Sequence, residues 1–167
     1  SSRQGRHGHA LHLFFTGLSL QASIGGTVDP YPASVPTALR ACAHLADATS
    51  GRLIHALVLT RPALASDKVV ATALLDMYAK CGELANAERA FPEAPSVVSW
   101  NVMLGAYARN RETEAAFGLL RDMQIEDHGS VPADEITMLS VLPACSGPPD
   151  LARLRELHAF PVRRGRD

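Results

Sequence analysis

The sequence predicts an all-α fold in which helix-turn-helix repeats stack into an α-solenoid, a superhelix with a concave groove. Two internal similarities support this prediction. A shift of 29 residues places Thr72, Leu75, Tyr78-Ala79-Lys80 and Ala87 on Asn101, Leu104, Tyr107-Ala108-Arg109 and Ala116. A shift of 103 residues places Leu39, Ala41-Cys42 and His55-Ala56 on Leu142, Ala144-Cys145 and His158-Ala159. The longer shift is about three units of the length that is typical of stacked helical hairpins.

The composition favours tightly packed helices over a β-sandwich. Hydrophobic residues make up 47% of the chain, which suffices for a core, whereas aromatic residues make up only 5%. Alanine and leucine, both good helix formers, dominate. The formal net charge of −1 creates no strong global attraction to nucleic acid or to an anionic membrane. No apolar run reaches the roughly 20 residues that a membrane-spanning helix needs.

The three cysteines predict a structural role. Cys42 and Cys145 occupy the same repeat position, and with Cys81 their number is odd. We therefore expect small core residues in a reducing compartment rather than a disulfide framework. The chain begins with Ser1, and both ends fall inside a unit, so we expect a segment of a longer protein in which the lack of a targeting peptide is uninformative.

The periodicity divides the chain into five segments. They are the tail of a truncated repeat (1–31), a long unit (32–67), a short unit (68–96), a standard unit (97–134) and a truncated long unit (135–167). In the tail, the stretch 10–15 has the character of a second helix, which Gly25-Gly26 interrupts.

In the long unit, the first helix is marked by an apolar face at helical spacing, formed by Val35, Ala38, Leu39 and Cys42. Residues 44–50 are expected to form a polar turn. The second helix is expected over residues 51–60, with Leu53, Ile54, Leu57 and Val58 on its apolar side. Pro62 should stop it.

In the short unit, the sequence predicts helices over residues 69–80 and 83–91. Gly82 suits the left-handed position that follows a helix, and Pro92 and Pro95 prevent continuation. In the standard unit a first helix begins near Val97, and a second runs from about Glu112 to Met123. The apolar stripe of that second helix is Ala116, Leu119, Leu120 and Met123. Residues 126–130 are expected to be an irregular linker, and Pro143 should bend the first helix of the last unit.

Five stretches together resemble the pentatricopeptide repeat proteins of plant organelles, in particular the subfamily that alternates long, short and standard units. The stretches are 51–56, 72–82, 97–101, 134–137 and 142–145, and the resemblance covers nearly all of residues 32–160. It implies a right-handed superhelix that binds single-stranded RNA, about one base per unit. It further implies a location in the mitochondrion or plastid, and editing or processing factors as partners.

The resemblance also implies which residues contact RNA. The family reads each base with a polar residue of the first helix and the last residue of the unit, which here are Asn101 with Asp134, and Thr72 with Ser96. Val98 and Val69 match the apolar residues that sandwich the bases. In the family, Asn with Asp favours uridine, and Thr suggests a purine. An amide can donate and accept hydrogen bonds along a base edge. The corresponding residues of the long units are Pro36 and Leu139, whose side chains cannot form hydrogen bonds. The long units are therefore expected to be spacers.

Each of these residues also has a structural interpretation. Asn101, taken alone, could satisfy backbone donors at a helix start. We expect Trp100 in the core, and the histidines, including His55 and His158, in structural roles rather than on a metal. Cys42-Ala43-His44 is too sparse for zinc. Four cations, Lys68, Lys80, Arg109 and Arg111, either neutralise phosphates or are simply solvated at helix ends.

No pattern predicts catalysis, a metal or a cofactor. The sequence has no Gly-rich phosphate loop and no nucleophile elbow. It also lacks the His-x-Glu and Cys-x-x-Cys signature of the zinc deaminase that many of the resembling proteins carry after their repeats. We therefore expect a recognition module that is not an enzyme. The alternatives are a tetratricopeptide-like scaffold for protein–protein interaction, which the near-neutral charge suits, and a non-functional fragment of a gene of this family.

Overall fold

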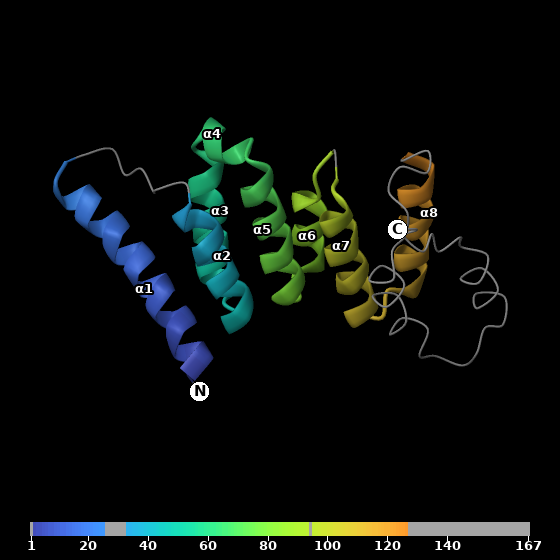
Figure 1. Cartoon of the computed structure of the whole chain (residues 1–167), viewed down its shortest axis with the longest axis horizontal. Coiled ribbons are helices and arrows are strands. Elements are labelled where there is room, and N and C mark those ends of the chain that lie inside the picture. The colour runs from blue at the N-terminus through green and yellow to red at the C-terminus, as the bar shows by residue number, and fades with distance from the viewer. Residues whose placement is uncertain (1, 26–32, 94, 127–167) are drawn as a thin grey trace, which may run out of the picture. The chain divides into compact units, whose positions relative to one another are not determined.

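A computed structural model describes residues 2–25, 33–93 and 95–126, and within these ranges every regular element is a helix (Figure 1). The all-α prediction is therefore confirmed. The helices are α1 (Ser2–Ser23), α2 (Ser34–Leu45), α3 (Ala48–Leu59), α4 (Pro62–Ala65), α5 (Lys68–Lys80), α6 (Leu84–Ala90), α7 (Val97–Arg109) and α8 (Thr113–Glu126). None of the described helices is both long and apolar enough to cross a membrane. The chain forms two compact units, residues 1–92 and 93–167.

The first compact unit contains α1 to α6. Helix α2 packs against α1 and α5, and α3 packs against α2 and α5. The first helices of the predicted long and short units, α2 and α5, are thus neighbours, as the stacking of hairpins requires. The predicted apolar face of α2 is confirmed, since Val35, Ala38, Leu39 and Cys42 are all buried. The stretch 10–15 of the tail lies in α1, where Leu11 and Phe14 are buried.

Three helical hairpins close with the same turn. Each has a residue in the left-handed region, Ala46 (φ 53°), Gly82 (φ 76°) or Arg111 (φ 60°), directly after or near a helix end. The next residue donates its backbone N–H to the carbonyl five positions earlier, in the bonds Asp47 to Cys42 (3.0 Å), Glu83 to Tyr78 (3.0 Å) and Glu112 to Tyr107 (2.9 Å). This is the Schellman motif, and it confirms the left-handed conformation predicted for Gly82.

The long unit departs from the sequence-based expectation at three places. The polar turn is short, because α2 continues to Leu45 and α3 begins at Ala48 after the N-cap Asp47, whose carboxylate accepts the Ser50 N–H. Leu53, predicted on the apolar side of α3, is exposed, whereas Ile54 and Val58 are buried. Helix α3 ends at Leu59, ahead of Pro62 as predicted, but an unexpected one-turn helix, α4, then begins with Pro62 at its first position, which needs no N–H donor.

The second compact unit contains the hairpin of α7 and α8. Trp100, Met103 and Leu104 of α7 are buried, which confirms the core position predicted for Trp100. On α8 the residues Ala116, Leu120 and Met123 are buried as predicted, but Phe117 rather than Leu119 completes the apolar stripe. The larger aromatic side chain takes the more deeply covered place.

Several predictions fall outside the described residues. They concern the linker after residue 126, the last unit with Pro143, and the residues Asp134, Leu139, Cys145 and His158.

Candidate nucleic-acid interface

The starts of α5 and α7 are set by polar caps. The Asp67 carboxylate accepts the N–H groups of Val69 (2.7 Å) and Val70 (3.3 Å), and the Ser96 hydroxyl oxygen accepts the N–H of Ser99 (3.3 Å). Such caps satisfy backbone donors that a helix start leaves unpaired. Val69 and Val98 are therefore each the second residue of a first helix, in the register predicted by the 29-residue shift.

Both of these valines face solvent. Val69 and Val98 are each 57% exposed, whereas Val70 beside Val69 is almost fully buried. A large apolar side chain at the same exposed position of two successive first helices offers surface to a flat apolar partner such as a base. Covering it would be favourable, at roughly 25 cal/mol per Å² of apolar surface.

One turn after each valine stands the predicted base-reading residue. Thr72 is partly exposed, and its hydroxyl donates to the Lys68 carbonyl (2.9 Å), so its lone pairs remain for a ligand. Asn101 is half-buried in α7. Residues three apart share a helix face, so each polar residue lies on the side of its valine.

The structure excludes one of the two interpretations of Asn101. The N-cap of α7 is Ser96, five residues earlier, and Asn101 lies inside the helix. The alternative that Asn101 caps the helix is therefore wrong. Ser96 is predicted to read a base as the last residue of the short unit. Its hydroxyl oxygen accepts the Ser99 N–H and lies 3.1 Å from Ser99 Oγ. Its role towards RNA stays a prediction, as does that of Asp134.

The four cations differ in their surroundings. The Lys80 ammonium pairs with the Asp76 carboxylate (2.8 Å), one turn back on α5, which favours the structural interpretation for this residue. Lys68 lies exposed in the first turn of α5, and Arg109 and Arg111 lie exposed at the end of α7.

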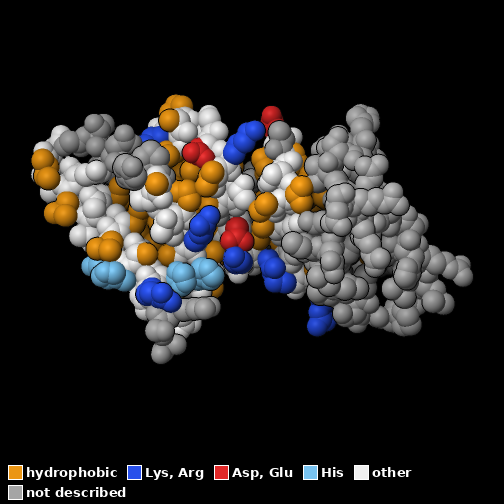
Figure 2. All heavy atoms as spheres, viewed as in Figure 1, with side chains coloured by type: hydrophobic (Ala, Val, Ile, Leu, Met, Phe, Trp, Pro, Cys, Tyr) orange, Lys and Arg blue, Asp and Glu red, His pale blue; other side chains and the backbone are white. Residues whose placement is uncertain are grey.

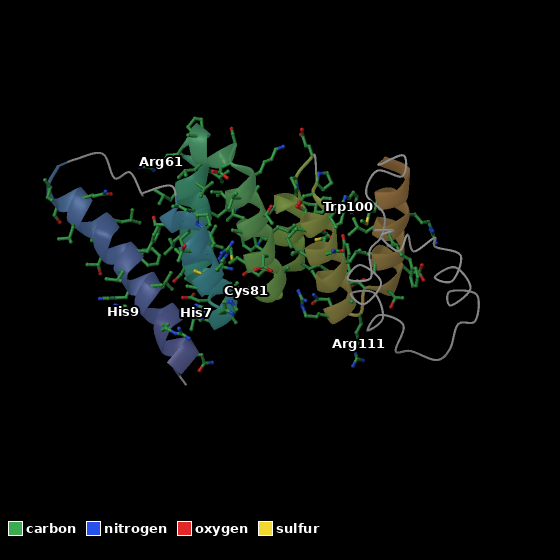
Figure 3. The ribbon with its side chains drawn as sticks, viewed as in Figure 1. His7, His9, Arg61, Cys81, Trp100 and Arg111 are labelled. Carbon is green, nitrogen blue, oxygen red and sulfur yellow. The ribbon has the colours of Figure 1, made fainter. Side chains whose placement is uncertain are left out.

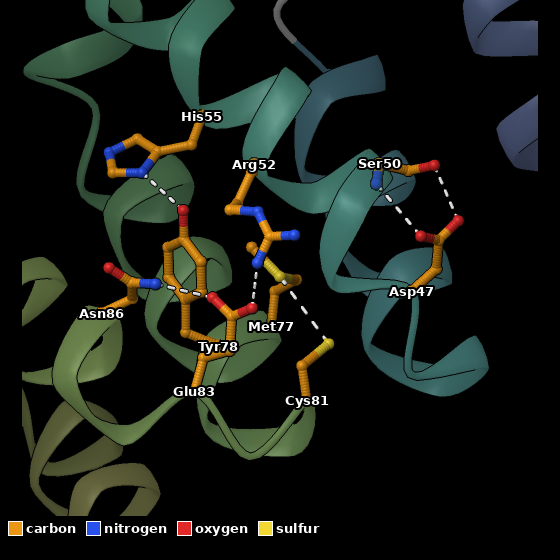
Figure 4. A network of polar contacts seen from close by, with 9 residues as sticks. All are labelled: Asp47, Ser50, Arg52, His55, Met77, Tyr78, Cys81, Glu83 and Asn86. Atoms are coloured by element: carbon orange, nitrogen blue, oxygen red, sulfur yellow. Dashed lines mark hydrogen bonds and ion pairs between the residues drawn. The ribbon is translucent and has the colours of Figure 1, made fainter.

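A polar network that the sequence did not reveal joins α3 to the next hairpin (Figure 4). Arg52 forms an ion pair with Glu83, and the second carboxylate oxygen of Glu83 accepts the Asn86 amide (2.6 Å). His55 Nδ1 lies 2.8 Å from the Tyr78 hydroxyl. These contacts give Arg52 and His55 polar partners on a helix that packs against its neighbours. They confirm a structural role for His55.

Burial shifts the pKa values of groups in and beside this network. It lowers the pKa of His55 below its usual 6.5 and raises the pKa of Tyr78, which the Glu83 charge raises further. The Cys42 thiol is buried, and its pKa rises to about 12, mainly through burial. Cys42 therefore stays a thiol, which agrees with the predicted core role; Cys81 is half-buried, with Sγ 3.9 Å from Met77 Sδ.

We predict that acid weakens the fold through His55. Because the folded-state pKa lies below the unfolded value, the unfolded chain binds the proton more readily, and stability is complete above pH 6.5. It should fall as the pH drops through 6.5 towards the folded pKa. Chemical denaturation between pH 5 and 8 should show this loss in the wild type and a smaller one in His55→Gln, with exposed His12→Gln as the control. Equal pH dependence in all three proteins would contradict the role of His55.

Among the described residues, no group of three His, Cys, Asp or Glu side chains could hold a metal ion. Taken separately, the hairpin that contains α5 and the hairpin that contains α7 each expose an apolar side chain beside a hydrogen-bonding one, an arrangement that suits binding. Stacked hairpins with a repeated closing turn define an α-helical repeat protein.

Comparison with known proteins agrees with this class. The family model of the PPR repeat matches residues 98–128, which contain all of α7 except its first residue and all of α8. A pentatricopeptide repeat-containing protein of Arabidopsis thaliana is 32% identical over 149 residues, covering 88% of this chain and 15% of its own length. Two others from Arabidopsis are named mitochondrial (31% over 144 residues; 85% of this chain, 21% of its own) and chloroplastic (37% over 134 residues; 79% and 16%). The chain belongs to the pentatricopeptide repeat family, and it spans about a fifth or less of the length of these relatives.

Proposed function

We propose that this chain binds single-stranded RNA in a mitochondrion or plastid and selects its sequence for processing or editing, without catalysing a reaction itself. The observation that carries the proposal is the repeated pair of Val69 with Thr72 on α5 and Val98 with Asn101 on α7. In each pair, a valine that is 57% exposed precedes a hydrogen-bonding side chain by one turn. A base can rest on the valine while the polar group meets its edge.

The unit boundaries follow from the same proposal. Residues 32–67, 68–96 and 97–134 act as long, short and standard units, and the last two each read one base. Asn101 with Asp134 selects uridine, and Thr72 with Ser96 favours a purine. Pro36, at the equivalent place of α2, lacks a side-chain hydrogen-bonding group, so the long unit spaces its neighbours. The organelle is supported by relatives whose names are mitochondrial or chloroplastic.

The proposal predicts that Asn101→Ala weakens base discrimination. Loss of one or two hydrogen bonds to the base edge should lower the preference for the selected base by about fivefold, since a net hydrogen bond contributes about 1 kcal/mol. Selection from a randomised RNA pool, followed by titration of single-base variants of the preferred RNA, measures this. Val98→Ala should lower affinity for all bases, whereas Leu59→Ala, a similarly exposed aliphatic residue on a second helix, should not.

The salt dependence of binding distinguishes RNA binding from the competing function, which is a scaffold for a protein or peptide. RNA binding should weaken with a slope of about −0.7 per phosphate contact in a plot of log affinity against log salt. Unchanged base preference in Asn101→Ala, together with a flat salt dependence, would refute RNA reading and favour the scaffold.

A further inference from the structure

The start of α1 meets the end of α2 at an open pocket of about 530 Å³, lined by Gln4, Arg6, His7 and His44. The imidazole rings of His7 and His44 stack, with their centroids 4.3 Å apart and an angle of 16° between their planes. Figure 3 shows His7 on the side of α1 that faces α2, whereas His9 points away from it. Neither the repeat register nor the proposed base-reading residues use this pocket.

The surroundings of the pocket are basic in a chain whose net charge is −1. Helices α1 and α2 carry four of the seven histidines and no aspartate or glutamate. On the face shown in Figure 2, histidine and arginine side chains gather where these two helices meet. The nearest carboxylate along the described chain is that of Asp47, which does not line the pocket. Its two oxygens accept the backbone N–H (3.0 Å) and the hydroxyl (2.7 Å) of Ser50.

The lining selects the ligand class. All four side chains can donate N–H groups, and the Arg6 guanidinium is always charged, which suits an anion with several acceptor oxygens. A metal ion fits poorly, because Arg6 repels it and nearly parallel imidazole planes do not direct two nitrogens at one ion. A phosphate group takes several N–H donors at once, and imidazole and guanidinium planes also stack on bases.

We propose that this pocket binds a phosphate group, supplied by the backbone of the RNA strand outside the base-reading helices. This inference rests on the proposed function. It adds to that function a phosphate contact that fixes the position of the strand without reading its sequence.

Nuclear magnetic resonance of the histidine side chains in the whole 167-residue chain tests the pocket directly. Sodium phosphate, uridine monophosphate and a single-stranded RNA oligonucleotide are titrated in turn. We expect saturable shifts of the His7 and His44 resonances with all three, and none at exposed His12, which is on α1 but does not line the pocket. Half-saturation at an at least tenfold lower concentration of oligonucleotide than of phosphate supports strand phosphate. If oligonucleotide and phosphate reach half-saturation at the same concentration, free phosphate replaces the RNA strand as the source. If neither ligand causes a saturable shift, the proposal of a phosphate-binding pocket is wrong.

Variants separate this inference from the proposed function. Arg6→Gln and His44→Gln, with His12→Gln as the matched control, leave the described core untouched, which circular dichroism verifies. Both should lower oligonucleotide affinity roughly three- to tenfold and reduce the salt slope by about 0.7 per lost contact, with base preference unchanged. Wild-type affinity in both variants, while Asn101→Ala still alters base preference, overturns the pocket alone. Shifts of His7 and His44 with phosphate in a chain that binds no RNA overturn the RNA function and leave a free-phosphate pocket.

Discussion

Replacing Gly51 by leucine should lower the free energy of unfolding by about 3 kcal/mol, the upper end of the usual cost of overpacking a core. Gly51 lies in α3 where this helix crosses α5. A Cβ atom at this position would lie 2.4 Å from Met77 Sδ and 2.6 Å from Met77 Cε, and Met77 is itself fully buried. A leucine must therefore push α3 away from α5 or displace Met77, and its better helix propensity offsets only about 1 kcal/mol.

The matched control for this substitution is Gly118→Leu. Gly118 is also a mid-helix glycine, but nothing lies within 4 Å of the place that a Cβ atom would take there, so the fold should tolerate the substitution. In the double variant Gly51→Leu with Met77→Ala, the freed volume should recover part of the loss, giving a destabilisation below the sum of the two single effects. Urea denaturation of the single and double variants measures these losses. Strict additivity, or equal losses for Gly51→Leu and Gly118→Leu, would show that the contact with Met77 does not govern this position.

Leu75→Ala should destabilise the chain by about 2–5 kcal/mol, whereas Leu53→Ala should change stability by less than about 0.5 kcal/mol. Leu75 is fully buried on α5, a helix that packs against both α2 and α6, so its truncation should leave a cavity. Leu53 on α3 is 60% exposed. The chemical change is identical in the two variants, and only the surroundings differ.

Thermal and urea unfolding of this pair also tests the correction to the sequence-based interpretation of α3. Periodicity places Leu53 beside Ile54 on the apolar side of the helix, and the structure places it in solvent. A loss of about 2 kcal/mol or more for Leu53→Ala would favour the position that periodicity predicts. A small effect for Leu75→Ala would contradict the packing of α5 between its neighbours.

Part of the candidate interface could be predicted from the sequence. The 29-residue register placed Val69 and Val98 at one position and Thr72 and Asn101 at another, and the exposure of both valines agrees with a ligand-facing place. Sequence alone could not exclude Asn101 as a helix cap, because that depends on where α7 begins. The pocket of Arg6, His7 and His44 could not be foreseen, since it exists only where α1 docks on α2.

The amino-acid sequence by itself determined the helices and their repeated hairpins, because these depend on local spacing and turn chemistry. The face of Val35, Leu39 and Cys42 and the left-handed Gly82 were both readable for that reason. Only the tertiary structure decided which side of a second helix is covered, as with Leu53 and Phe117. It also decided the close approach of Gly51 to Met77 and the pairing of Arg52 with Glu83 and of His55 with Tyr78. Those contacts join residues far apart in the sequence, and no local pattern encodes which surfaces meet when one hairpin packs on the next.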